Sequence, residues 1–152
     1  MNKFINRYNV LLQEYQEFYA KFEKEASENL KDMFKEFFGQ NPKVRAIVWS
    51  QYTPYFNDGS ECVFQVGESV CFTNVPDPEN IRWGEYEGKY EDAQVYTGYE
   101  SKDFIFNTAL CDELKQIIEN EGLLPILKTT FGDHCKVIVT KNGIQTEECS
   151  HD

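Results

Sequence analysis

The sequence predicts a single α+β domain, in which an antiparallel sheet is packed by a long N-terminal helix and a C-terminal helical pair. Helical periodicity fills residues 2–38, strand-like alternation follows over residues 44–74, and helical periodicity returns over residues 108–131. A hairpin is expected to close the chain over residues 135–149. Helices and strands are thus segregated along the chain, which is typical of α+β proteins. The length of 152 residues is that of one domain.

Residues 2–38 carry the clearest helical pattern. An apolar stripe recurs at spacings of four and three residues, at Phe4, Tyr8, Leu11, Tyr15, Phe18, Phe22, Ala26, Leu30, Met33 and Phe37. The pattern predicts one helix, or two helices joined near Ser27, with Gly39 as the C-cap and Pro42 blocking continuation. The stripe either packs on the core or pairs with a second copy in a homodimer, because its first turns have heptad spacing.

Three strand-like runs follow. Residues 44–50 predict one strand, and residues 61–66 and 70–74 predict a hairpin with its turn at residues 67–69. In that hairpin Cys62 and Cys71 lie on different rungs, so we expect no disulfide between them. The five cysteines form no C-x-x-C pair. This disfavours a zinc or thioredoxin motif and favours free thiols in a cytoplasmic, reducing compartment.

Residues 75–107 form an aromatic, acidic insert without a clean period. Its Trp and Tyr residues are Trp83, Tyr86, Tyr90, Tyr96 and Tyr99. Eight acids stand against three bases in this segment. So long an irregular stretch in a compact domain is usually functional.

The C-terminal third predicts two helices and a hairpin. The first helix is expected over residues 108–121, with Thr108 as its N-cap and Gly122 at its end. A shorter helix begins near Pro125 and runs to Phe131. The pair Asn142-Gly143 lies between two strand-like runs and predicts a hairpin there.

The charge balance excludes whole classes of partner. Lys plus Arg total 15 against 26 Asp plus Glu, giving a net charge of -11. Such a chain repels the phosphate backbone of nucleic acids and the surface of anionic membranes, so we expect neither as a partner. No run of about 18 apolar residues exists, so no membrane span is expected.

Motifs for catalysis and metal binding are sparse. The chain has two histidines, His134 and His151, and carries no Walker A, G-x-G-x-x-G or G-x-S-x-G motif. Residues 57–61 faintly resemble a calcium loop but lack its alternating ligands. We therefore expect no catalytic residue, no metal ligand and no cofactor.

The segment from Trp49 to Cys62 has the most unusual composition. It is either a structural connection with inward aromatics or a ligand pocket, in which aromatic faces stack flat rings and amides donate hydrogen bonds. The expected ligand-binding residues are Trp49, Gln51, Tyr52, Tyr55, Asn57 and Asp58, with Arg82 and Trp83 from the insert. The nearest candidates for phosphate contacts are Lys43, Arg45, Arg82 and Lys89.

The run Trp-x-Gln-Tyr-Thr-Pro-Tyr-Phe-Asn-Asp-Gly, which begins at Trp49, resembles a sequence in a family of small phage and bacterial proteins. The similarity is confined to residues 44–74. It implies a phage-type accessory protein in the cytoplasm of a bacterial host, of the kind that inhibits host defence. It implies no site residues.

These observations favour a non-enzymatic binding protein of anti-defence type that sequesters a small nucleotide-like ligand through an aromatic loop, residues 49–58. One alternative is an acidic protein-interaction inhibitor, a nucleic-acid mimic that blocks a host enzyme through a basic protein partner. Residues 51–107 favour it, since they carry 11 acids and 3 bases. A second alternative is a hydrolase that depends on paired carboxylates.

Overall fold

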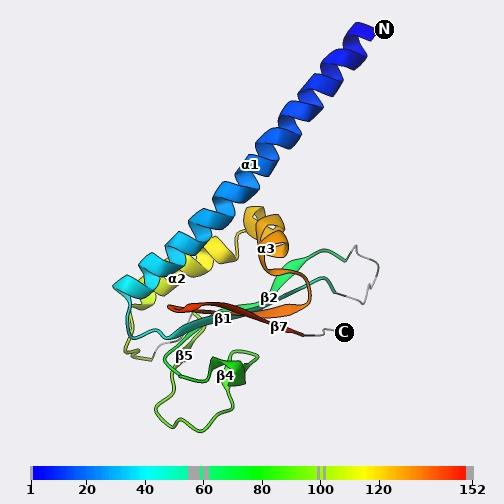
Figure 1. Cartoon of the computed structure of the whole chain (residues 1–152). Helices are drawn as coiled ribbons and strands as arrows, with labels where there is room; N and C mark the ends of the chain where they lie inside the picture. The colour runs from blue at the N-terminus through cyan, green and yellow to red at the C-terminus, as the bar shows by residue number, and fades with distance from the viewer. Residues whose placement is uncertain (1, 55–58, 60–61, 99, 101, 150–152) are drawn as a thin grey trace.

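A five-stranded antiparallel sheet of order β5-β2-β1-β6-β7 lies at the centre of the protein (Figure 1). Its strands are β1 (Ala46–Tyr52), β2 (Gln65–Thr73), β5 (Val95–Tyr96), β6 (Cys135–Thr140) and β7 (Gly143–Glu148). The computed structural model describes residues 2–54, 59, 62–98, 100 and 102–149. The predicted α+β class with an antiparallel sheet is confirmed.

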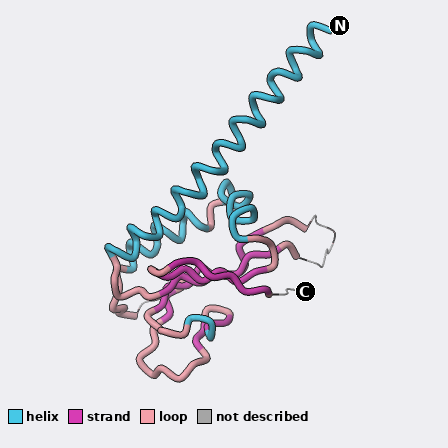
Figure 2. The backbone as a smooth tube through the Cα atoms, in the orientation of Figure 1, coloured by secondary structure: helices cyan, strands magenta, loops and turns pink. Residues whose placement is uncertain are grey.

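Three helices cover one face of this sheet (Figure 2). They are α1 (Asn2–Gln40), α2 (Thr108–Ile118) and α3 (Leu124–Phe131), the last preceded by the 3-10 turn η2 (Glu121–Leu123). The C-terminal half of α1 buries Leu30, Phe34 and Phe37 in the main core. Alternation along the strands sends Ile47 and Phe72 to the same core.

The insert covers part of the opposite face of the sheet and builds a second, smaller core. It contains the 3-10 turn η1 (Pro78–Asn80) and a two-stranded hairpin of β3 (Ile81–Arg82) and β4 (Glu85–Tyr86). Ile81 packs there against Val48 and Ile138 of the sheet. Lys136 of β6 fastens the insert, because its Nζ donates hydrogen bonds to the carbonyls of Glu79 (2.8 Å) and Ile81 (2.7 Å).

α1 is one continuous helix of 39 residues, so there is no break near Ser27. It also includes Gly39 and ends at Gln40, so the C-cap lies at Asn41, two residues after the predicted Gly39. Asn41 closes the helix, because its backbone N–H donates to the carbonyl of Phe37 (2.8 Å). Pro42 follows as predicted.

The predicted hairpin over residues 61–74 is wrong. β2 runs unbroken through Gly67 and pairs along its length with β1, with an irregularity in the register between Val48 and Ser50. Gly67 serves close packing and not a turn, since a Cβ at this position would overlap the Tyr52 ring. The extended β1 partner thus outweighs the local turn signal of a single glycine.

The C-terminal elements follow the prediction with shifted ends. Asn107, not Thr108, caps α2, because its Oδ1 accepts a hydrogen bond from the Leu110 N–H (3.2 Å). α2 ends at Ile118, and Gly122 lies in η2. The predicted β6–β7 hairpin is confirmed, with Thr140 paired to Gly143.

The N-terminal half of α1 projects away from the sheet and the other helices (Figures 1 and 2). Its apolar stripe is exposed there, and the exposed fractions of Phe4 and Phe18 reach 76% and 69%. In the described part of the chain, no helix has the length and apolar content needed to cross a membrane.

Candidate functional site

The structure uses the first two predicted site residues, Trp49 and Gln51, in the core between β1 and α3. Both side chains are buried, and the Trp49 indole N–H donates to Gln51 Oε1 (3.0 Å). Gln51 Nε2 in turn donates to the carbonyls of Leu127 (2.9 Å) and Gly132 (2.6 Å). The polar groups of both side chains are therefore satisfied inside the protein.

Tyr52 lies on the other face of β1 and is half-buried, with its hydroxyl 3.4 Å from the Gln65 amide that donates to it. Tyr55, Asn57 and Asp58 lie outside the described residues. The described start of this loop is held by Asp133, which accepts from the backbone N–H (2.9 Å) and hydroxyl (2.7 Å) of Thr53. A ligand role for Tyr52 stays a prediction.

Arg82 and Trp83 belong to the β3–β4 hairpin, on the face of the sheet opposite to Trp49 and Gln51. The structure therefore does not bring these two pairs of predicted residues together. Trp83 is 68% exposed and has a φ of 55°, in the left-handed region that a bulky residue rarely adopts. Gly84 follows with a φ of 74°, so the hairpin turns on these two residues.

A groove of about 660 Å³ opens at one end of the central strands, where the chain enters β1 and leaves β2. Its lining residues are Pro42, Lys43, Arg45, Asn74, Val75, Pro76, Tyr90, Asp92, Ala93 and Ile105. The volume is in the range of small-molecule sites. Two of the four predicted phosphate contacts, Lys43 and Arg45, lie in this groove.

The walls of the groove are held by short polar contacts. Arg45 is fixed at the backbone, where its N–H donates to the carbonyl of Thr73 (2.8 Å). Asn74 holds the insert by donating to the carbonyl of Asp92 (3.2 Å) and accepting from the N–H of Gln94 (2.7 Å). Gln94 Oε1 accepts in turn from the N–H of Ile105 (3.0 Å). The backbone that carries the groove side chains is thereby fixed.

The groove gathers positive charge in an acidic protein. Lys43 and Arg45 are exposed, and neither has an ion pair with another described residue. Lys89 lies beside the groove, with its Nζ 5.8 Å from the centroid of the Tyr90 ring. Asp92 is the one carboxylate among the described lining residues, and the Tyr90 side chain is 38% exposed. These groups suit a ligand that combines an anionic group with a flat ring.

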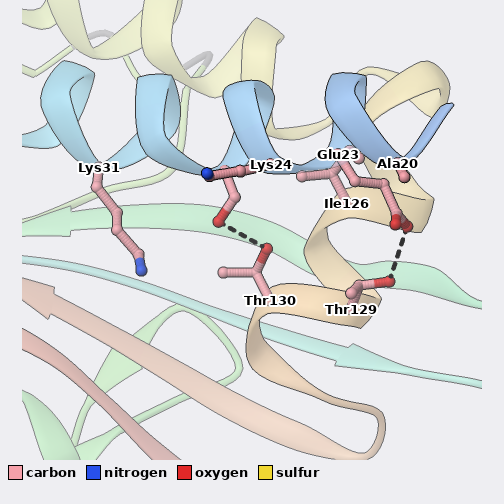
Figure 3. Close-up of a pocket in the computed structure, with 8 residues that line it drawn as sticks. Ala20, Glu23, Lys24, Lys31, Ile126, Thr129 and Thr130 are labelled. Atoms are coloured by element: carbon pink, nitrogen blue, oxygen red, sulfur yellow. Dashed lines mark hydrogen bonds between the residues drawn. The ribbon is translucent and has the colours of Figure 1, made fainter. Parts of the chain in front are cut away.

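A second groove, of about 390 Å³, lies between α1 and α3 (Figure 3). Figure 3 shows Glu23 on α1 reaching Thr129 on α3, whose hydroxyl donates to Glu23 Oε1 (3.3 Å). One turn further along α1, the Thr130 hydroxyl donates to the Ser27 hydroxyl (3.2 Å). These two hydrogen bonds link the side chains of α1 and α3 along the groove.

The titratable core residues suit structural roles. Burial raises the pKa of the Cys111 thiol to about 12 and that of Cys135 to about 11, so neither is a reactive thiolate near neutral pH. Burial, followed by the hydrogen bond from its hydroxyl to Asp112, raises the pKa of Tyr96. Across the described residues, no three His, Cys, Asp or Glu side chains form a group suited to a metal ion.

Comparison with known proteins assigns no function, so the candidate site rests on the geometry described above. No protein-family profile, curated protein or solved structure matches the chain significantly. The sequence named Lys43 and Arg45 as phosphate contacts and Tyr90 among the aromatics of the insert, but it did not predict the groove that brings them together. The available signal was the spacing of Lys43 and Arg45 just before a buried strand, which puts two exposed cations at one end of that strand.

Proposed function

We propose that the protein is a binding protein for a small nucleotide-like ligand, and that its site is the groove of Lys43, Arg45 and Tyr90. The observation that supports this most is the meeting of these two cations with an exposed tyrosine ring, in a chain whose net charge is -11. Arg45 supplies a planar fork of donors for a phosphate, and Lys43 adds a second cation. The Tyr90 ring offers a stacking face, which is worth about 1–3 kcal/mol per base in single-strand binders.

The acidic surroundings act against an anion at long range and little at short range. At physiological ionic strength the Debye length is about 8 Å, so distant carboxylates are largely screened. A phosphate between Lys43 and Arg45 is therefore governed by the cations that it contacts. Asp92, in the same groove, offers an acceptor for a base N–H and disfavours a second phosphate beside it.

The test is a thermal-shift screen with nucleoside mono-, di- and triphosphates, cyclic nucleotides and ADP-ribose derivatives. At 100 times its Kd a ligand adds about 2.7 kcal/mol, which raises the Tm of a domain of this size by about 5–10 °C. Arg45→Glu should abolish the shift. Lys141→Glu makes the same change in charge at an exposed β6–β7 loop residue and should preserve the shift. No shift with any ligand, or equal shifts in both variants, would contradict the proposal.

A second function, an acidic inhibitor of a basic protein, is favoured by Trp83. A bulky residue held at φ 55° costs about 1–3 kcal/mol, and exposed tryptophans are frequent interface anchors. Trp83→Gly should relieve the backbone strain and raise stability while it weakens a salt-sensitive complex. Titration of the wild type and Trp83→Gly with a basic protein, at low and high salt, separates this function from the first.

A further inference from the structure

The projecting part of α1 carries a larger apolar surface than a monomer normally exposes. Its exposed large side chains are Phe4, Ile5, Tyr8, Leu11, Leu12, Tyr15, Phe18 and Phe22. Five of the eight are aromatic, with about 150–250 Å² each, and three are somewhat smaller aliphatic residues, so together they expose on the order of 900 Å² at the exposed fractions observed. The largest apolar patch on a typical monomer is about 300–600 Å². A standard interface buries about 800 Å² per partner, so the stripe is large enough for a stable one.

The spacing of the stripe identifies the kind of partner. From Phe4 to Phe22 the side chains fall on the a and d positions of a heptad, with Tyr8, Tyr15 and Phe22 at a. The e positions hold Ile5 and Leu12, which widens the apolar seam. This pattern favours a second amphipathic helix lying along α1 over a compact globular surface.

The charges beside the seam select the partner as a second copy, in antiparallel orientation. The g positions alternate in sign, with Arg7, Glu14, Lys21 and Glu28. In an antiparallel pair, g positions flank g positions, so Arg7 meets Glu28 and Glu14 meets Lys21 of the second copy. The same register places Tyr15 against Phe18 and Leu11 against Phe22 in the two inner layers, and sets Tyr8 against Glu25 and Phe4 against Asn29 in the outer layers. In a parallel pair the g charges face the apolar e positions instead and gain no opposite charge.

These groups are available for such pairing. All four g residues are exposed, and Arg7, Glu14 and Glu28 have no ion pair with another described residue. Lys21 contacts Glu25 at 4.0 Å, a solvent-exposed pair that contributes little. In this register Glu23, which bonds to Thr129 of α3, lies 13 residues along the helix from Glu23 of the second copy. At 1.5 Å per residue the two acidic globular parts therefore begin about 20 Å apart, beyond the Debye length of about 8 Å.

We infer that the protein forms an antiparallel homodimer through residues 4–28 of α1, with Glu14 and Lys21 of each copy paired to Lys21 and Glu14 of the other. This inference goes beyond the proposed ligand groove and does not depend on it. Both grooves of the dimer lie at the far ends of α1, where residues 42–45 follow the helix.

Sedimentation of the full chain from about 1 to 100 µM tests the inference. We expect a species of twice 17.8 kDa at the higher concentrations. Leu11→Glu and Phe18→Glu should each remain monomeric, whereas Asn9→Glu, which adds the same charge away from the seam, should dimerise normally. Circular dichroism checks that each variant is folded. A wild-type chain that stays monomeric at 100 µM would overturn the inference.

A charge swap tests the orientation. Glu14→Lys or Lys21→Glu alone places like charges together at two symmetric points, and each should weaken the dimer about 5- to 10-fold at low salt. The double variant restores both pairs and should recover the wild-type Kd within about 2-fold. A dimer whose Kd does not respond to the single changes, or a double variant as weak as the single ones, would overturn the antiparallel pairing.

Discussion

Gln51→Leu removes the polar link between β1 and α3 at nearly constant side-chain volume. The substitution removes the acceptor of the Trp49 indole N–H and the Gln51 donor of the Leu127 and Gly132 carbonyls, of which Gly132 keeps the weak donor of the Cys135 thiol (3.5 Å). Each buried polar group left unpaired costs about 1–3 kcal/mol, and the added apolar surface returns about 1 kcal/mol. We therefore expect a loss of at least about 2 kcal/mol, which corresponds to a fall of at least about 4–8 °C in Tm.

Urea unfolding followed by circular dichroism measures this loss, and Trp49→Phe completes a double-mutant cycle. Because Trp49→Phe removes the indole donor, the two changes should be non-additive by about 1–2 kcal/mol. A loss below about 1 kcal/mol for Gln51→Leu, or strict additivity, would refute the account of this network. If Gln51→Leu abolished nucleotide binding at unchanged stability, the aromatic loop, and not the groove, would be the site.

Three further substitutions test how the sheet holds its neighbours. Burial is the largest single influence on the pKa of Asp133 and raises it, but the hydrogen bonds from Thr53 and the interactions with His134 together lower this pKa below 3.8. The stabilisation of the fold by the Asp133 carboxylate is therefore fully present above pH 4–5 and is lost as the pH falls through the lowered pKa. Asp133→Asn should lower the free energy of unfolding in urea by about 1–3 kcal/mol at pH 7 and by less at pH 2–3. An equal loss at both pH values would contradict this. Gly67→Ala should lower the free energy of unfolding by about 1–3 kcal/mol, because its Cβ overlaps the Tyr52 ring. Adding Tyr52→Ala should reduce this loss, and an unchanged loss caused by Gly67→Ala in the Tyr52→Ala background would show that the ring is not the obstacle. Lys136→Met leaves two carbonyls of the insert without a donor, so hydrogen exchange should speed up selectively over residues 75–93, and uniform protection there would contradict the tethering role.

The elements with strong periodicity could be predicted from the sequence. The stripe of α1 fixes a single helical face, and the Asn142-Gly143 signal fixes the β6–β7 hairpin, because both depend on neighbouring residues alone. The turn expected at Gly67 failed for the opposite reason. The conformation of that glycine is decided by pairing with β1 and by the Tyr52 ring, which are tertiary contacts.

The candidate site was harder to predict for the same physical reason. Trp49 and Gln51 look like ligand contacts in a polar, aromatic string, but the Trp49 indole donates to Gln51, and Gln51 donates to backbone carbonyls at and just after α3, about 80 residues away. The groove brings Lys43 and Arg45 to Tyr90 through an insert that has no periodicity of its own, held by Asn74. Which insert residue meets the two cations is set by those side-chain bonds and cannot be read from local spacing.

The most direct test of the proposed function is a residue-resolved NMR titration of the full chain with the nucleotide that gives the largest thermal shift. We expect the backbone amide signals of Lys43, Arg45, Tyr90 and Ala93 to shift together and to saturate with one Kd, while those of Gln51 and Tyr52 stay unchanged. Shifts confined to residues 52–54 and the loop that follows would place the ligand at the aromatic loop. That result would contradict the groove as the site.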